Sequence, residues 1–337
     1  MKRCRRCVLP ENFPGARLDE QGICQYCRED KGSEFLNEQK TRHRERFFSL
    51  MKNLKGKSEY DALMSYSGGK DSSFTLQLLT QDFGLNVLAV TFDNGFLAPQ
   101  ALRNIHAVTD ALDVDLVIRK IGFGTMRRIF VESARRHIYA PGTLVRASTI
   151  CTSCIAFVKF GALRTCVEKS IPFNVFGWSP GQIPIASSLL KNNPRMVRIM
   201  QKAHHDPLHR IAGNRVRPYF LEDRHFAPGM AFPFNVSPLV FMDYNEDTIR
   251  TRISEMGWKP PSDIDPNSTN CLINAFANHI HMRRYGYNPY VFELAKLVRD
   301  GYMDRAEALN RLNEPEPTAT IDAVRELLFP GGEEDGG

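Results

Sequence analysis

The stretch YDALMSYSGGKDSSF, residues 60–74, decides the fold of this chain of 337 residues. Its first part is apolar enough for a buried strand, and its last part begins a helical stretch that continues to residue 80. Between them lies SGGKDS (67–72), whose two glycines let backbone amides turn toward an anion. The helix that follows adds free N–H groups and the positive end of its dipole. We therefore predict a phosphate-binding turn between a strand and a helix.

The side chains of this turn suit a nucleotide. Lys70 can neutralise phosphate charge, and the hydroxyls of Ser67 and Ser72 can donate hydrogen bonds. Asp71 would repel a phosphate unless a cation lay between them, so we expect Mg²⁺ with oxygen ligands. The GxxxxGK[ST] spacing of a Walker A loop is absent. The alternative is a turn that only joins strand to helix.

Strands and helices alternate after this turn. Further strands are expected at 85–93, 115–120 and 173–178, and helices at 99–112, 123–137 and 152–169. This alternation predicts an α/β fold, a parallel sheet with helices on both faces that binds ligands at the carboxyl ends of its strands. Asp93 and Gly177 end two of these strands and are expected to border the nucleotide. For each, a simple strand-ending turn is the alternative.

Eight cysteines divide into two groups and one extra residue. Cys4-x-x-Cys7 and Cys24-x-x-Cys27 have the spacing of a structural zinc ribbon with four thiolate ligands. The alternative is a set of free thiols in a flexible tail. Cys151-x-x-Cys154 precedes a helix, and Cys271 follows much later in the chain. Cys166, in the middle of a helical stretch, is expected to be a small buried residue. Disulfides are not expected, because the chain shows no secretory signal and the cytosol is reducing.

The SGGKDS turn after a first strand resembles the PP-loop of the N-type ATP pyrophosphatases. This resemblance implies an adenine-nucleotide α-hydrolase-like fold, with Ser67, Gly68, Gly69, Lys70, Asp71 and Ser72 holding ATP and Mg²⁺. It implies that ATP is split into AMP and pyrophosphate. AMP is placed on a carbonyl-type oxygen of the acceptor, which a sulfur or nitrogen nucleophile then displaces.

The remaining cysteines resemble a pattern of the PP-loop tRNA thiolases. The resemblance implies a [4Fe–4S] cluster on Cys151, Cys154 and Cys271, with one iron left open to carry sulfide. It assigns Lys70, Asp71, Cys151 and Cys154 to catalysis. The alternative is that Cys151 and Cys154 are a redox pair or buried, and that Cys271 belongs to the core.

A second family is similar over more of the chain. CRRCVLP (4–10), DEQGICQYC (19–27), the SGGKDS turn, the cysteine pair at 151–154 and ELAKLVRDG…RAEAL (293–309) resemble the N-acetyl sugar amidotransferases. That resemblance implies ammonia from a partner glutaminase. A cysteine at the place of Cys271 is not part of it, so we expect sulfur transfer first and ammonia transfer as the alternative.

Composition limits the class of protein. Apolar residues make up 42% and charged residues 24%, as in soluble globular proteins. The net charge of +6 lies wholly within residues 1–58, which favours phosphate-rich partners such as RNA, although a solvated helix face is the alternative. No transmembrane helix and no signal peptide are expected, and we predict a cytoplasmic protein without membrane contact.

We expect a zinc ribbon at 1–30, a polar helical connector at 31–58, the PP-loop domain at 59–190, a substrate and C-terminal helical region at 191–312, and a mostly disordered tail at 313–337. Residues 180–270, which span the end of the third part and much of the fourth, read as loops and short helices. A basic stripe of Arg127, Arg128, Arg135, Arg136 and His137 suits RNA phosphates, the adenylate or plain solvent. His204, His205 and His209 are expected in a solvated loop, with metal or phosphate as the alternative.

The acceptor stays open between a tRNA base, a small metabolite and an N-acetyl sugar, and the partner between a sulfur donor and a glutaminase. A homodimer is one option that the sequence leaves open. A nucleotide sensor or RNA-binding module without enzyme activity is the alternative from another class, but the presence of both Lys70 and Asp71 argues against it.

Overall fold

The computed structural model describes residues 1–261 and 270–331 of the chain. Within this part, six strands form one sheet in the order β3-β2-β1-β4-β6-β5. In this order, the strands from β3 to β6 are parallel to one another. The last strand, β5, lies at the edge and runs antiparallel to β6. The strands are β1 Ala62–Ser65, β2 Val87–Asp93, β3 Asp115–Lys120, β4 Phe173–Phe176, β5 Leu189–Lys191 and β6 Phe234–Val236.

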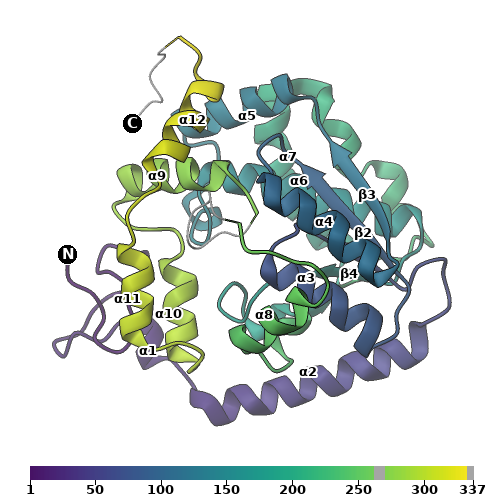
Figure 1. Cartoon of the computed structure of the whole chain (residues 1–337), viewed down its shortest axis with the longest axis horizontal. Helices are drawn as coiled ribbons and strands as arrows, with labels where there is room; N and C mark the ends of the chain where they lie inside the picture. The colour runs from purple at the N-terminus through teal and green to yellow at the C-terminus, as the bar shows by residue number, and fades with distance from the viewer. Residues whose placement is uncertain (262–269, 332–337) are drawn as a thin grey trace.

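Helices cover both faces of the sheet, because successive side chains of a strand point to opposite sides. Ala62 and Met64 pack with one layer of helices, whereas Leu63 packs against Ala162 and Cys166 of α6 on the other side. Figure 1 shows helices on both sides of the sheet. The helices that follow the first strands are α3 Lys70–Gln77 with its π-helical continuation η1 Leu78–Asp82, α4 Pro99–Leu112, α5 Phe123–Arg135 and α6 Thr149–Glu168. The predicted α/β architecture and its first four strands are confirmed.

The strand order places a crevice beside β1. The chain proceeds from β1 to β2 and β3 on one side and continues with β4 on the other side. The loops that leave the carboxyl ends of β1 and β4 therefore diverge, and ligands bind at such a point in open α/β sheets. The SGGKDS turn follows β1, and Gly177 follows β4.

Residues 180–270 differ from the expected loops and short helices. They contain the edge strands β5 and β6, the long helix α7 Pro194–Ala212 and the helix α8 Glu246–Ser254. Each of these strands has only three residues, which is too short for a periodic pattern to show in the sequence. Short 3₁₀ helices join the elements of the chain: η2 Pro141–Thr143, η3 Ile185–Ser187, η4 Gly213–Tyr219, η5 Asp223–Phe226 and η6 Pro238–Val240. Residues 262–269 lie outside the described part.

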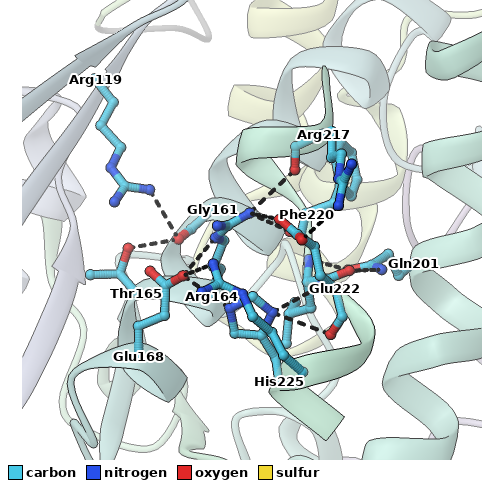
Figure 2. A network of polar contacts seen from close by, with 12 residues as sticks. Arg119, Gly161, Arg164, Thr165, Glu168, Gln201, Arg217, Phe220, Glu222 and His225 are labelled. Carbon is cyan, nitrogen blue, oxygen red and sulfur yellow. Dashed lines mark hydrogen bonds and ion pairs between the residues drawn. The ribbon is translucent and has the colours of Figure 1, made fainter. Parts of the chain in front are cut away.

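A polar network attaches this region to the C-terminal half of α6. The guanidinium of Arg164 contacts Glu168 at 2.9 Å and Glu222 at 3.2 Å. The buried His225 lies with Nε2 2.9 Å from the same Glu168 carboxylate, as Figure 2 shows. Burial alone would raise the pKa of Glu168, but the bonds from His225 and Arg164 outweigh it and hold that pKa below its usual range. The network thus fixes the helix that carries Cys151 and Cys154.

The two ends of the chain meet. After α1 Gln25–Arg28, the helix α2 Gly32–Leu54 runs along the sheet and packs Phe47 against Phe173 and Phe241. The C-terminal region contains α9 Ile273–Tyr285, α10 Val291–Arg299, α11 Arg305–Asn313 and α12 Thr318–Leu328. The N-terminal cysteine module shares a core with α10 and α11 (Figure 1). It is therefore docked on the C-terminal helices.

The expectation of a mostly disordered tail does not hold over α12. Its side chains Ile321, Val324 and Leu328 are buried, and Phe329 follows them into the core near α9. The acidic and Pro-rich flanks hid this short amphipathic helix in the sequence. Residues 332–337 lie outside the described part.

Helix α6 is long and apolar enough to cross a membrane by length and composition, with a mean hydropathy of 1.5, which the sequence analysis did not foresee. However, 67% of the apolar window is buried inside the fold, as in the core helix of a soluble domain. Cys166 is fully buried there beside Leu63, as expected, and burial raises the pKa of its thiol.

Candidate functional site

The SGGKDS loop, residues 67–72, passes from β1 into α3. Gly68 has φ +72°, and a Cβ there would lie 2.4 Å from the carbonyl oxygen of Ala101. The carbonyl oxygen of Gly68 accepts a hydrogen bond of 3.0 Å from the indole of Trp258. Gly69 is the N-cap of α3, so the loop leads directly into the N-terminus of the helix. Only glycine fits at position 68, and the hydrogen bond from Trp258 holds the turn in place.

Lys70 is almost fully buried and is surrounded by oxygen atoms. Its Nζ lies 3.1 Å from Oδ1 of Asp71 and 3.3 Å from Oε1 of Glu246, and it donates a 3.0 Å hydrogen bond to the hydroxyl of Tyr244. That hydroxyl in turn donates to Asp71 at 3.2 Å. The carboxylates of Asp71 and Glu246 therefore balance the charge of Lys70, near the position where a phosphate would contact it.

Glu246, at the start of α8, is itself held from the C-terminal helices. Arg311 of α11 approaches its carboxylate at 3.4 Å and also pairs with Glu307. Burial alone would raise the pKa of Glu246, but Lys70 and Arg311 outweigh this and lower it. The carboxylate is thus ionised, and Lys70 has a charged partner when no anion is present.

Three cysteines share one cavity with this loop. The cavity has a volume of about 370 Å³ and is lined by Ser67, Gly69, Lys70, Asp71 and Ser72 on one side. Cys151, Cys154 and Cys271 line it on another. Cys151 and Cys154 come from the first turns of α6, whose N-cap Ser148 accepts a hydrogen bond of 3.1 Å from the Cys151 N–H.

Long-range contacts bring Cys271 to the pair. It forms an isolated antiparallel bridge with Leu97, and the N–H of Leu272 donates to the carbonyl of Phe96 at 2.9 Å. Asn94, in the same loop after β2, directs its amide to the sulfur atoms of Cys154 at 3.4 Å and Cys271 at 3.5 Å. One asparagine therefore joins thiols that are 117 positions apart in the chain.

Asn274 of α9 makes the corresponding hydrogen bond to the third thiol, that of Cys151. Its amide donates to the sulfur of Cys151 at 3.6 Å, and its oxygen accepts from the hydroxyl of Tyr290 at 3.2 Å. Burial raises the pKa of Cys154 and of Cys271, and the Asn94 amide partly offsets that increase. The thiols of Cys154 and Cys271 are thus desolvated groups that favour either a proton or a bound metal.

The N-terminal cysteines form a tighter group. The sulfur atoms of Cys4, Cys7, Cys24 and Cys27 are buried and lie within 4.8 Å of one another. The separations of 3.8 Å between Cys4 and Cys27 and 3.7 Å between Cys7 and Cys24 match a tetrahedron with metal–sulfur bonds of about 2.3 Å, whose edges are about 3.8 Å. Backbone N–H groups of Cys7 and Cys24 also point at the Cys4 sulfur. These residues fit one tetrahedral metal ion.

No other Cys, His, Asp or Glu residues gather so closely over 1–261 and 270–331. The three cavity thiols line the same cavity but are not part of such a group. The described lining of the cavity contains no fourth cysteine. A cluster held there would keep one position open.

Of the two residues expected to border the nucleotide, Gly177 lines the cavity and Asp93 does not. Gly177 lines the cavity, and a Cβ at this position would lie 2.7 Å from the Cα of Ser72, so the glycine allows β4 to approach the SGGKDS loop. Asp93 is not in the cavity lining. It accepts from the N–H of Gly95 at 2.8 Å and pairs with Lys120 at 2.8 Å, which is the strand-ending turn named as the alternative.

The basic stripe also divides. Arg127 donates to the carbonyl of Leu328, and Arg135 lies over the ring of Phe329, so both hold the end of α12. Arg128, Arg136 and His137 border a second cavity together with Arg210 of α7. None of these five residues lines the main cavity, and contact with RNA or the adenylate stays a prediction.

The three histidines lie on helix α7 and not in a loop. His204 packs against the rings of Tyr139 and Phe160, and His205 stacks on His209. The cavity lining also includes Asn94, Tyr244, Glu246, Asn274 and Glu293, none of which was predicted as a site residue. Asn94 adjoins Asp93 in the strand-ending FDNG segment, which was the available signal. The others lie far from the SGGKDS loop in sequence. Glu293 lies in the ELAKLVRDG segment quoted above for its family resemblance, and no local pattern marks the rest.

No protein-family profile matches the chain. The uncharacterized protein MJ1599 of Methanocaldococcus jannaschii is 23% identical over 270 residues, which are 79% of this chain and 77% of that protein. Among solved structures, the U34-tRNA thiolase NcsA from Methanococcus maripaludis with its [4Fe-4S] cluster has a TM-score of 0.37 and 16% identity, over 97% of this chain and 88% of that one. A TM-score of this size is too low to assign a fold or a function.

Proposed function

We propose that this chain is an ATP-dependent, AMP-forming transferase of the PP-loop type that activates a carbonyl oxygen and replaces it with sulfur. The observation that supports it most is the shared cavity. The SGGKDS loop lines one side, and three cysteines from two distant segments line another. Amide side chains direct these thiols, whereas unused core cysteines need no such contacts.

The loop side accounts for the nucleotide. The N-terminus of α3 and Lys70 would bind the β- and γ-phosphates, because backbone N–H groups and an ammonium group favour negative charge. Asp71 would face Mg²⁺, which bridges a carboxylate and phosphate oxygens. Lys70 would exchange its contacts with Tyr244 and Glu246 for phosphate oxygens. The acceptor oxygen would then attack the α-phosphate, and pyrophosphate would leave in the loop.

The cysteine side accounts for the sulfur. Soft thiolates suit iron, and Cys151, Cys154 and Cys271 on one cavity would supply three of the four ligands of a [4Fe–4S] cluster. When bound, such a cluster would carry sulfide at its open iron. Asn94 and Asn274 orient the three sulfur atoms and tune them by hydrogen bonds.

The N-terminal group has a separate, structural part. Four thiolates at tetrahedral spacing leave no open position for a substrate, so we assign Zn²⁺ to Cys4, Cys7, Cys24 and Cys27. The ion would hold a module that shares its core with α10 and α11, which in turn line the main cavity.

Iron analysis tests the cysteine side. Anaerobically purified protein should be brown and contain about four iron per chain, with about one zinc. Cys271→Ser should lose the iron and keep the zinc. Cys166→Ser is the matched control, because Cys166 is buried in the core away from the cavity. Colourless protein that contains only zinc, and that is active with ammonium, would contradict sulfur transfer and fit ammonia transfer.

Product analysis tests the loop side. ATP, Mg²⁺ and sulfide are supplied with bulk tRNA, or with small amide and N-acetyl sugar acceptors, and AMP and pyrophosphate are quantified. The wild type should release both in equal amounts, and Lys70→Ala should lose at least about a hundredfold in rate. Lys52→Ala, on the exposed face of α2, is the control. Release of ADP and phosphate, or full activity of Lys70→Ala, would contradict the proposal.

A further inference from the structure

Glu293 has no part in the function described so far. It begins the ELAKLVRDG segment and lies in the first turn of α10, the helix that joins the N-terminal module to the main cavity. Its side chain borders that cavity and is otherwise surrounded by protein. A carboxyl group on the wall of a phosphate-binding cavity requires an explanation, because a carboxylate would repel the ligand.

The loop after β4 is shaped to receive this side chain. A Cβ at Gly181 would lie 2.7 Å from the carbonyl oxygen of Glu293 and 2.8 Å from its Cγ, so only glycine lets α10 approach so closely. The hydroxyl of Ser179 donates a 2.9 Å hydrogen bond to Oε1 of Glu293. Gln182 accepts from the N–H of Ser179 at 2.9 Å and thereby completes the turn. The carboxyl group is therefore held in place.

The same face of α10 reaches both halves of the site. Tyr290 lies one turn before Glu293 and donates to Asn274, which holds Cys151. On the other side, the charges of Lys70 and Asp71 act on Glu293. Glu293 thus borders the cavity that the three cysteines and the SGGKDS loop also line.

The surroundings favour a neutral carboxyl group. Burial raises the pKa of Glu293 to about 7, and the negative charge of Asp71 adds to this, against the hydrogen bonds of Ser179 and Gln182 and the charge of Lys70. Tyr244 and Glu246, which also line the cavity, do not change this preference for the protonated form of Glu293. Glu246 is ionised and paired with Lys70, and the pKa of Tyr244 is raised, so its hydroxyl keeps its proton.

We propose that Glu293 is a nucleotide-binding residue that, in its protonated form, donates a hydrogen bond to a phosphate group held by the SGGKDS loop, so that nucleotide binding takes up a proton. This inference rests on the proposed function, since it needs a nucleotide in the cavity. The ligand class is a magnesium-bound di- or triphosphate, including pyrophosphate. A phosphate group would add negative charge beside Glu293 and stabilise its neutral form further.

The sign of the pH dependence follows. Below about pH 6, Glu293 of the ligand-free protein is already protonated, so ligand binding takes up no proton. Above about pH 7, it must first gain a proton, so the affinity for the phosphate ligand should fall as the pH rises. Glu293→Gln keeps a neutral hydrogen-bond donor at every pH. It should bind about tenfold more tightly than the wild type at pH 8 and equally at pH 6.

The test is isothermal titration calorimetry of the full chain with MgATP, and separately with magnesium pyrophosphate, at pH 7.5. Each titration is run in two buffers of different ionisation enthalpy, which reports the protons taken up. The wild type should take up roughly 0.5 to 1 proton more than Glu293→Gln. Glu326→Gln, an exposed carboxyl on α12, is the matched control and should behave as the wild type does.

The outcomes separate this inference from the function on which it rests. If MgATP binds and the wild type takes up no more protons than Glu293→Gln, the role of Glu293 is overturned and the nucleotide site stands. If MgATP does not bind at all, both are overturned. Should Glu293→Gln fail to fold, Glu293→Asp and the two-buffer titration of the wild type decide, and uptake of no proton by the wild type counts against the proposal.

Discussion

Single residues set the shape of the SGGKDS loop. Gly68 combines a left-handed backbone with a closest approach to Ala101 that leaves no room for a side chain. The carbonyl of Gly68 also binds Trp258, so the loop cannot move away without loss of a buried hydrogen bond. The loop geometry is therefore determined by position 68 more than by the charged residues beside it.

We predict that Gly68→Ala destabilises the fold by at least about 2 kcal/mol, from backbone strain and the clash with Ala101. Urea unfolding measures the change. Gly124→Ala is the control, because this position in α5 has open space around it and alanine favours a helix. Equal stability of the two variants would show that the loop adapts.

A second residue-scale effect concerns His281 in α9. Its ring is buried against Tyr285 and Tyr287, and neither ring nitrogen has a hydrogen-bond partner among the described residues. Burial, with a smaller effect of Arg284, lowers the pKa of His281 to about 4. The folded state therefore binds fewer protons than the unfolded state between pH 4 and 6.5.

Stability should consequently rise with pH across that window, and this histidine should cost up to roughly 3 kcal/mol as the pH falls from 6.5 to 4. His281→Phe should flatten the unfolding free energy between these pH values. His106→Gln, at an exposed histidine of α4, should leave the slope unchanged. A wild-type slope retained in His281→Phe would refute this assignment.

At the scale of elements, α12 shows how a short amphipathic helix escapes detection. Three buried side chains hold it near α9, while Arg127 and Arg135 grip its C-terminal end. The sequence around it is rich in Pro, Glu and Gly, which is typical of disorder. Packing against the rest of the fold stabilises the helix, since an isolated helix of this length is marginal.

Two adjacent leucines test this packing. Leu328 is fully buried and Leu327 is 55% exposed. Leu328→Ala should cost about 2–5 kcal/mol of unfolding free energy, whereas Leu327→Ala should change it by at most about 0.5 kcal/mol. Chemical denaturation compares them directly. Equal, small effects would mean that α12 is not docked in solution.

At the scale of the whole molecule, the N-terminal and C-terminal regions together support one wall of the cavity. Arg305 of α11 donates to the backbone carbonyls of Cys4 and Cys7, and the same helix carries Arg311, which holds Glu246 beside Lys70. The N-terminal cysteine module therefore supports the cavity wall, although it lies outside the cavity itself.

Metal removal should loosen this arrangement. A chelator strong enough to remove zinc, or Cys24→Ser, should lower the melting temperature and expose α10 and α11 to limited proteolysis, because the ion would hold together the two cysteine turns of the module that packs on these helices. Arg17→Ala, at an exposed residue of the module, is the control. An unchanged melting curve after metal loss, verified by elemental analysis, would exclude a structural role for the ion.

Features that depend on neighbours in the chain could be predicted from the amino-acid order: the strand–turn–helix around SGGKDS, the alternation of the first four strands, and the paired cysteines of the N-terminal module. The grouping of Cys271 with Cys151 and Cys154 was expected from a family resemblance and not from a local pattern. Only the folded structure shows that Glu246 neutralises Lys70 and that Glu293 lies on the cavity wall. These contacts join residues more than a hundred positions apart and depend on how helices pack across the sheet, and no local pattern encodes that packing.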